Sequence, residues 1–384
     1  MADQTRGDTA SWGRTREALP SKMKAMTFAE FGTPDVLRLA EVDTPLPGPD
    51  EVAIRVAAVS VGRLLDLSAR GGTHPYARIA LPHILGAEHA GTIVETGSNV
   101  TSVQVGERVA VFPVLSCGHC PACLEGAIEA CPEARIMGVH TSGAYAEYTV
   151  VPAANTFPIP DDLSEVDAAA LALSGAVAQN QFDQAGLAAG DWVLVQGGSS
   201  ALGSLTVALA LHHGARVITT SRSPEKRARL TALGAHAALD PLDSSFLDRV
   251  LDLTGNAGVA IAIDDLGEPA IWAATMRALA IRGRVVSSGA FLGGQVELDL
   301  LRLYSRSQRV IGVRSGNLRS ARRLWEAAAA GFRPIVDRVF PVAQAADAHR
   351  YLESDTNTGR VVLSTADDDW SITPGSGTKG GARP

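Results

Sequence analysis

The 384-residue sequence predicts an α/β protein in which a doubly wound parallel sheet is joined to a second, β-rich domain. Three observations support this fold class. The chain is too long for one hydrophobic core, so two domains are expected. Residues 23 to about 150 show short strand patterns broken by Gly and Pro. From about residue 167, strand-like segments alternate with helical ones.

The first half of the chain supplies the β-rich domain. The segment EVAIRVAAV (51–59) is a predicted strand. AGTIVETGSNVTSVQVGERVAVFP (90–113) predicts two strands that are joined by a turn rich in Gly and Asn. Near the other end, GRVVLS (359–364) predicts a last strand that returns to this first domain.

The second half predicts the parallel sheet. Helical stretches such as PEKRARLTALG (224–234), which has Pro at its start and Gly at its end, separate most of its strands. SARRLWEAAAAG (320–331) predicts a further helix. Crossover helices between consecutive strands are typical of a doubly wound sheet. The six predicted strands are Trp192–Gln196, Arg216–Thr220, Ala237–Asp240, Val259–Asp264, Arg284–Ser288 and Arg309–Val313.

The charge and hydropathy of the chain exclude several classes of function. The net charge of −7 argues against nucleic-acid binding, which favours a basic surface. No apolar run approaches the ~20 residues that cross a bilayer, so no membrane partner is expected. Residues 1–22 and 366–384 are polar, and we expect both to be flexible. Without an apolar signal segment, a cytoplasmic and therefore reducing location is the expectation.

The four cysteines of the chain all lie in CGHCPACLEGAIEAC, with the spacing C-x2-C-x2-C-x7-C. In a reducing compartment such a compact run predicts a zinc site, because short loops let one lobe wrap a tetrahedral ion. Two local disulfides or free thiols are the alternative. Four protein ligands leave no open coordination position, so this zinc would be structural. The predicted ligands are Cys117, Cys120, Cys123 and Cys131.

A Gly-rich turn between a strand and a helix predicts a dinucleotide site in DWVLVQGGSSALGSLTVALALHHGARVITTSRS (191–223). Gly197 would form the tight turn, and Gly203 would allow the helix to pack closely on the strand. The pyrophosphate would lie at the helix N-terminus, on the backbone amides of Ala201 and Leu202. Hydroxyls of Ser199 and Ser200 are candidate phosphate donors. The alternative is a βα turn without a ligand.

The end of the second strand of this unit indicates which nicotinamide cofactor binds. An acidic side chain there would bind the ribose 2′-hydroxyl of NAD, but this chain has Ser221 and Arg222, with Lys226 one turn later. Cationic groups at this point favour a 2′-phosphate, so the sequence predicts NADPH over NADH. The alternative is that Arg222 and Lys226 only solvate a helix start.

Taken with the cysteine run and the Gly-rich turn, three segments resemble the medium-chain dehydrogenase/reductase superfamily, which includes zinc alcohol dehydrogenases and quinone oxidoreductases. They are LPHILGAEHAGTIVETGSNVTSVQVGERVAVFP, SGAYAEYTVVPA and GFRPIVDRVFPVAQAADAHRYLESDTNTGRVVL. The resemblance implies a GroES-like catalytic domain formed by 23–165 and 316–365, with a zinc lobe at 117–131. It also implies a Rossmann cofactor domain at 166–315 and a cleft between the two domains.

The same resemblance assigns two further features. Gly289 and Ala290 in VVSSGAF match the turn whose backbone contacts the nicotinamide carboxamide in relatives. The edge segment QRVIGV resembles the strand through which relatives pair their Rossmann sheets, which implies a homodimer.

The chain departs from the zinc-dependent relatives at the catalytic metal. In an ungapped comparison, the three positions that bind a catalytic zinc in those relatives are here Gly62, Ala87 and Leu173, none of which can bind metal. Glu88 keeps its place beside the second of them. Because all four cysteines belong to the lobe, no thiolate remains for a second site, and we expect a reaction that proceeds without catalytic zinc.

Without a Lewis acid, hydride transfer to an electron-poor C=C bond is easier than reduction of a simple carbonyl, because charge spreads to a remote oxygen. The leading prediction is therefore an NADPH-dependent reductase that acts on a small enone or quinone. A carbonyl or iminium reductase or alcohol dehydrogenase of the same superfamily is one alternative. A cofactor-binding protein without catalysis is the other.

Candidate catalytic donors follow from their expected place in the cleft. They are Ser60, Arg63, Gln179 and Asn180. Arg63 could instead bind an acidic or CoA-type substrate. His89, on a predicted strand, is expected to be a core residue with satisfied hydrogen bonds.

Overall fold

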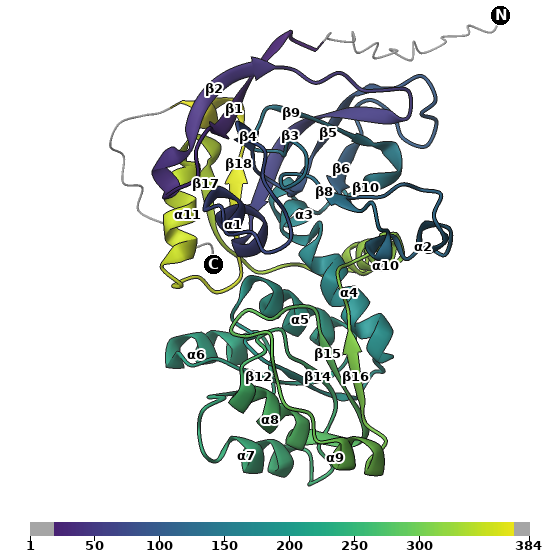
Figure 1. Ribbon diagram of the computed structural model, residues 1–384, viewed down its shortest axis with the longest axis vertical. Coiled ribbons are helices and arrows are strands. Elements are labelled where there is room, and N and C mark those ends of the chain that lie inside the picture. The colour runs from purple at the N-terminus through teal and green to yellow at the C-terminus, as the bar shows by residue number, and fades with distance from the viewer. Residues whose placement is uncertain (1–18, 372–384) are drawn as a thin grey trace, which may run out of the picture.

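A computed structural model describes residues 19–371. Figure 1 shows a β-rich part and an α/β part, connected mainly through α4 and α10 and through the chain that returns to the β-rich part. The flexible ends predicted at 1–22 and 366–384 fall mostly outside the described residues. In the described part of the C-terminal segment, Trp370 is buried in the core of the β-rich part and donates its Nε1–H to the Thr365 carbonyl at 3.2 Å.

The β-rich part is built on a seven-stranded sheet in the order β10-β6-β5-β3-β18-β17, with β9 also paired to β3. Strand β3 is long and almost wholly buried, as its Val- and Ala-rich sequence predicts. A three-stranded sheet, β2-β1-β4, packs beside it. The bounds are β1 Lys22–Phe28, β2 Arg38–Asp43, β3 Glu51–Val61, β4 His83–Ile84, β5 Glu88–Thr96, β6 Arg108–Val111, β9 Tyr148–Pro152, β10 Thr156–Pro158, β17 Val336–Pro341 and β18 Arg360–Ser364.

Strand register in this sheet brings distant polar residues together. Ser60 near the end of β3 pairs with Glu88 of β5 on one side and with Val362 of β18 on the other. The predicted return of 359–364 to the first domain is confirmed, because β18 pairs with β3. Arg360, the first residue of β18, therefore lies beside Ser60 although 300 residues separate them.

The α/β part contains a six-stranded sheet in the order β13-β12-β11-β14-β15-β16, and every neighbouring pair is parallel. All six predicted strands are confirmed; β15 begins five residues earlier than predicted. The order reverses direction between β11 and β14, the point where doubly wound sheets bind ligands. The strands are β11 Trp192–Val195, β12 Arg216–Thr220, β13 Ala237–Leu239, β14 Val259–Ile263, β15 Leu279–Ser287 and β16 Arg309–Gly312.

Helices cover both sheets and join the two parts. Helix α4 ends at Gly186, whose φ of 66° is a conformation that glycine adopts without strain. Helix α10 packs on α4, and α3 packs on β3 and β5. The helices are α3 Glu165–Leu171, α4 Ser174–Ala185, α5 Ala201–His212, α6 Pro224–Ala232, α7 Phe246–Leu253, α8 Pro269–Ala278, α9 Leu300–Ser305, α10 Leu318–Ala329 and α11 Ala345–Glu353.

Short elements complete the connections, and none of the described helices is both long and apolar enough to cross a membrane. They are η1 Pro34–Val36, η2 Arg63–Leu67, α1 Ser68–Arg70, β7 Val114–Leu115, α2 Pro121–Leu124, η3 Ile128–Ala130, β8 Arg135–Ile136, η4 Ala153–Asn155, η5 Val342–Gln344 and η6 Asp367–Trp370.

Candidate functional site

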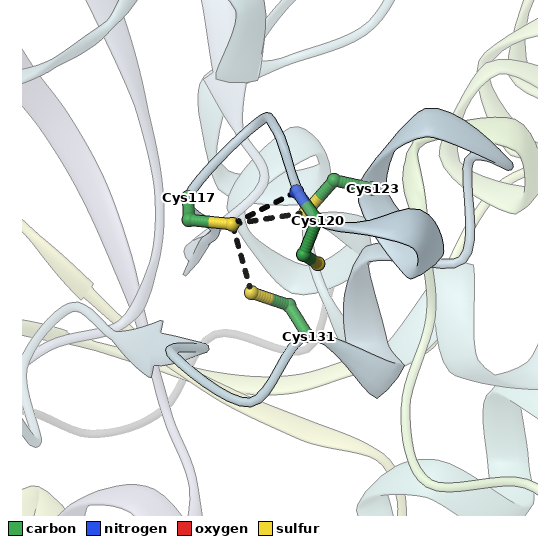
Figure 2. Close-up of side chains that lie close together, drawn as sticks. All are labelled: Cys117, Cys120, Cys123 and Cys131. Atoms are coloured by element: carbon green, nitrogen blue, oxygen red, sulfur yellow. Dashed lines mark hydrogen bonds between the residues drawn. The ribbon is translucent and has the colours of Figure 1, made fainter.

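The four cysteines converge in one lobe, between β7 and β8 (Figure 2). Their four sulfur atoms lie within 4.8 Å of one another. The Sγ of Cys117 is 3.9 Å from that of Cys123 and 3.7 Å from that of Cys131. These separations are too long for a disulfide, which joins sulfurs at about 2.05 Å. They match the edge of about 3.8 Å expected for a tetrahedron of thiolates at about 2.3 Å from zinc.

Local hydrogen bonds favour the thiolate forms of two of these ligands. A bond from the Ser116 side chain lowers the pKa of Cys123 to about 7, and a backbone bond from His119 lowers the pKa of Cys117. The pKa of Cys120 is raised to about 11, so the fit to a structural zinc rests on the four converging sulfur atoms rather than on the pKa values. The other group of possible ligands among residues 19–371, Cys117 with His119 and Glu133, shares a cysteine with this lobe.

The Gly-rich turn has the shape that a dinucleotide needs. Gly197 has a φ of +66°, and a Cβ on Gly203 would lie 2.4 Å from the Gly197 carbonyl oxygen, so both positions require glycine. Ser200 caps α5 by accepting from the Gly203 amide at 3.0 Å. The amides of Ala201 and Leu202 follow at the helix start, and within the described chain no group accepts from them.

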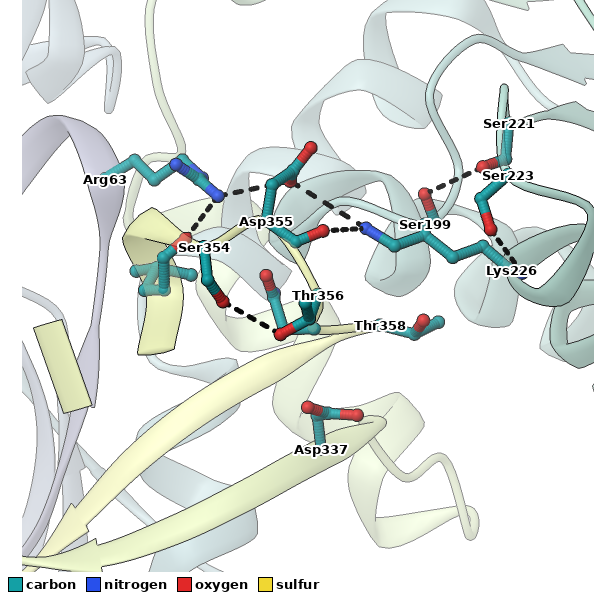
Figure 3. Close-up of polar contacts among 12 residues, drawn as sticks. Arg63, Ser199, Ser221, Ser223, Lys226, Asp337, Ser354, Asp355, Thr356 and Thr358 are labelled. Atoms are coloured by element: carbon teal, nitrogen blue, oxygen red, sulfur yellow. Dashed lines mark hydrogen bonds and ion pairs between the residues drawn. The ribbon is translucent and has the colours of Figure 1, made fainter. Parts of the chain in front are cut away.

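Beyond this turn, a polar bridge connects the two parts of the molecule (Figure 3). The Lys226 Nζ donates to the Asp355 backbone carbonyl at 2.6 Å and lies 3.8 Å from its carboxylate. The same carboxylate accepts from Arg63 at 3.1 Å. Ser199 and Ser221 are joined by a hydroxyl–hydroxyl bond of 3.3 Å. The structure thus brings Arg63 to the predicted cofactor residues.

Arg222 and the turn at 289–290 occupy two other edges of the predicted cofactor site. Arg222 is exposed at the end of β12, where no acidic side chain stands. Gly289 and Ala290 follow β15 and are exposed. Gly289 packs so closely that a Cβ on it would lie 3.1 Å from the Asp265 carbonyl oxygen.

Next to that turn lies a buried group that sequence reasoning missed. The Gln181 amide donates to the Asp265 carboxylate at 2.9 Å and to the Ser288 hydroxyl at 3.0 Å. Burial raises the pKa of Asp265 to about 6. Helical phase accounts for the miss: Gln181 is two residues after Gln179, about 200° around α4.

Gln179 and Asn180 accordingly face other partners. Gln179 lines a small surface pocket, where it donates to Asp183 at 2.7 Å and contacts His213 at 3.0 Å. Asn180 donates to the Ser315 carbonyl at 2.6 Å. The structure does not bring these two amides together with Ser60, and a substrate contact would require their present bonds to break.

Ser60 belongs to a polar cluster of four residues, in which Ser60, Glu88 and Arg360 are buried and Ser174 is partly exposed. The Arg360 guanidinium donates to Ser60 at 2.6 and 3.0 Å, to Ser174 at 2.8 Å, and to the Glu88 carboxylate. The side chains of Arg360 and Glu88 are 2% and 3% exposed. Glu88 also accepts from the Ser174 amide at 2.8 Å, so the α4 N-terminus lies on this cluster.

The three positions compared with catalytic-zinc ligands each lie next to a member of this cluster. Asp66 accepts from the Gly62 amide at 2.7 Å and from the Gly86 amide at 3.0 Å. Burial raises the pKa of Asp66 to about 7. A Cβ on Gly62 would lie 3.5 Å from Asp66 and 3.9 Å from Glu88. Ala87 is buried next to Glu88, and Leu173 directly precedes Ser174.

His89 has the core role expected of it. Its ring is fully buried, and its two nitrogens contact the Ala87 carbonyl at 3.0 Å and the Thr149 hydroxyl at 3.1 Å. Burial lowers its pKa to about 4, so the ring is neutral at pH 7.

Sequence reasoning missed Arg360 and Ser174 as well as Gln181. One signal for Arg360 was present, since it is a charged residue that opens the otherwise apolar strand GRVVLS. Ser174 gave no signal of its own, because a serine at a helix start is common.

Comparison with known proteins agrees with this geometry. Residues 48–161 match the model for the alcohol dehydrogenase GroES-like domain, and residues 201–330 match the model for zinc-binding dehydrogenases. An NAD-dependent alcohol dehydrogenase of Sulfolobus acidocaldarius is 32% identical over 89% of this chain and 99% of its own length. A quinone oxidoreductase of Rattus norvegicus is 27% identical over 89% of this chain and 97% of its length.

The solved structures lead to the same group of proteins. A crystal structure of an NAD-dependent alcohol dehydrogenase superposes with a TM-score of 0.82, at 33% identity, and covers 90% of this chain and 100% of its own. The structure of AibC has a TM-score of 0.83 at 31% identity, covering 90% of this chain and 96% of its own. The chain therefore belongs to the medium-chain dehydrogenase/reductase superfamily and is an NAD(P)-dependent oxidoreductase of that superfamily.

Proposed function

We propose that the chain is an NADPH-dependent reductase that adds hydride to an activated C=C bond of a small enone or quinone, without a catalytic zinc. The observation that carries this proposal is that the positions next to the buried cluster lack metal-binding side chains, while the cluster itself holds a cationic hydrogen-bond donor. Gly62, Ala87 and Leu173 offer no metal-binding side chain, and the buried cation there is the guanidinium of Arg360. A conjugated acceptor needs less polarisation than a simple carbonyl does.

The residues around the Gly-rich turn fit NADPH. The free amides of Ala201 and Leu202 would bind the pyrophosphate, with Ser199 and Ser200 beside them. Ser221, Arg222 and Lys226 would bind the 2′-phosphate, because no carboxylate at the end of β12 repels it. When bound, the cofactor supplies the hydride from its nicotinamide ring. The backbone of Gly289 and Ala290 would hold the carboxamide of that ring.

Domain limits and the remaining site residues belong to the same proposal. The catalytic domain would comprise 23–165 and 316–365, and the cofactor domain 166–315. Ser60 is the predicted catalytic residue that lies in the buried cluster. The contact of Arg63 with Asp355 supports a role for Arg63 at the cofactor phosphates. Roles for Gln179 and Asn180 stay predictions. One structural zinc would bind Cys117, Cys120, Cys123 and Cys131.

Reduction of a carbonyl or iminium group is the second candidate. Its support is that relatives with 32–33% identity are named alcohol and L-threonine 3-dehydrogenases. Reduction of a simple carbonyl would demand a strong hydrogen-bond donor in place of a metal.

An NADPH-oxidation assay separates these candidates. Purified protein, treated with a chelator and found to contain about one zinc per chain, would be tested against enones, quinones and aldehydes. Turnover of enones or quinones is the expected result. Turnover of aldehydes alone, lost with the chelator, would contradict the proposal, as would about two zinc ions per chain. NADPH binding without any turnover would favour the non-catalytic alternative.

A homodimer in the cytoplasm completes the proposal. Strand β16 lies at the free edge of the parallel sheet, and its Val310 side chain is exposed. Leu300, Leu301 and Tyr304 of the adjacent α9 are 65–71% exposed, which supports an apolar contact with a second copy. Light scattering of the purified chain should give twice the monomer mass of 40.0 kDa.

A further inference from the structure

The Arg360 guanidinium is a fixed positive charge in the interior, where a charge interacts more strongly than in water. Glu88 neutralises it, and Ser60 accepts two of its N–H bonds. One further N–H points to the Ser174 hydroxyl at 2.8 Å. The charge is thereby connected to a residue that, unlike the rest of the cluster, is partly exposed.

The Ser174 hydroxyl has an unused donor. Its oxygen accepts from Arg360, and its backbone amide is taken by Glu88. Among residues 19–371, no group accepts the hydroxyl proton of Ser174. A hydroxyl that accepts a bond from a cation becomes a stronger donor, because each bond polarises the next. The partial positive charge at the start of α4 acts in the same direction.

Ser174 also lies at a suitable distance from the predicted nicotinamide contact. Residues 174, 177 and 181 are spaced i, i+3, i+7 and share one face of α4. Gln181, at one end of this face, touches Asp265 and Ser288 beside the turn at 289–290. Ser174 precedes Gln181 by seven residues, and a rise of about 1.5 Å per residue separates the two by about 10 Å along the helix axis. That length accommodates a nicotinamide ring followed by a conjugated enone.

We propose that Ser174 is a catalytic hydrogen-bond donor to the carbonyl oxygen of the substrate, with Arg360 as the residue that positions and polarises it. This inference rests on the proposed function and names the group that replaces the metal. The hydride adds to the β-carbon, and the π electrons of the C=C bond move toward the carbonyl, giving an enolate. Ser174 keeps its proton and stabilises the enolate oxygen. A proton from water then adds to the α-carbon and completes the saturated product.

Substituting the hydroxyl tests the role in turnover. Ser174→Ala should lower kcat for an enone about 10²–10³-fold, as loss of one oxyanion donor does elsewhere, and should leave the Kd for NADPH within about twofold. Ser174→Thr, which keeps a hydroxyl, should retain most of kcat. Ser245→Ala is the matched control, since Ser245 precedes α7 and is bonded to Asp243. Wild-type kcat in Ser174→Ala would overturn the proposal.

A binding measurement tests the same role without turnover. We would titrate 4-nitrophenol, whose ionised form absorbs visible light and has an oxyanion like an enolate. Wild type should lower the apparent pKa of the bound phenol, and Ser174→Ala should remove this shift. An equal shift in both proteins would refute the donor role. If the alanine variant does not fold, Ser174→Cys keeps the size with a poorer donor and should show the same losses.

The two readouts also separate this inference from the proposed function. If wild type reduces no enone or quinone but Ser174 controls the phenol shift, the proposed substrate class fails and the donor assignment stands. If wild type reduces enones and neither readout depends on Ser174, the proposed function stands and the assignment of Ser174 fails.

Discussion

Replacing Glu88 by glutamine should destabilise the protein strongly, because it removes the carboxylate that neutralises a buried guanidinium. Glu88 accepts from Arg360 and from the Ser174 amide, and both charged side chains are at most 3% exposed. Breaking a buried ion pair from one side costs about 3–5 kcal/mol, since the remaining charge stays desolvated. The glutamine amide would also direct an N–H group toward the N–H donors that surround it.

The expected loss can be measured as a shift in thermal unfolding. For a domain of 150–250 residues, about 1 kcal/mol corresponds to a Tm change of about 2–4 °C, so a Glu88→Gln variant should melt about 6–20 °C below wild type. Circular dichroism gives the Tm, and urea titration gives the free energy of unfolding.

A surface pair provides the matched control. Asp347 pairs with Arg350 on α11, and both side chains are about half exposed. Asp347→Asn should therefore change the free energy of unfolding by less than about 1 kcal/mol. If Glu88→Gln is as mild as this control, the buried cluster does not depend on Glu88 for its charge balance, and the reasoning about Arg360 is refuted.

Three further predictions concern the zinc lobe, the cofactor site and pH. Cys131→Ser should lose the zinc and lower the Tm, measured by a chromogenic chelator and by calorimetry; full zinc content would contradict the lobe. Asp355→Asn removes the negative charge that lies 3.8 Å from the Lys226 Nζ and that accepts from Arg63, so NADPH should bind about two- to fivefold more tightly in a fluorescence titration; an unchanged or weaker Kd would argue against phosphate binding there. Since burial raises the pKa of Asp66 from 3.8 to about 7, its contribution to stability declines as pH rises between these values. Urea midpoints of Asp66→Asn should fall less over this range than those of wild type, and equal slopes would refute the prediction.

Much of the fold followed from local sequence patterns. The bounds of the six parallel strands were predicted to within five residues, because apolar strand segments alternate along the chain with helices that have recognisable start and stop residues. The cysteine spacing predicted the lobe, because zinc ligands on short loops are local in sequence. The Gly-rich turn was recognisable for the same reason, since its tight geometry involves only a few consecutive residues.

The candidate catalytic group was less accessible from the sequence. Gln179 and Asn180 were chosen by position, but the rotation of α4 directs Gln181 toward Asp265 and Ser288, beside the turn at 289–290. Arg63 was expected among the substrate donors, yet Asp355 connects it with Lys226. The spacing of apolar residues predicts that a segment is helical. It does not predict which face of the helix meets the other domain, because that depends on how the two domains pack together.

The sequence by itself determined the superfamily, the two types of sheet, the cysteine lobe and the absence of thiolates elsewhere. Tertiary structure alone decided that Arg360 reaches Ser60, 300 residues away, and Glu88, 272 residues away. The physical reason is that strand β18 returns to pair with β3. That register places side chains within hydrogen-bond distance although no local pattern connects them.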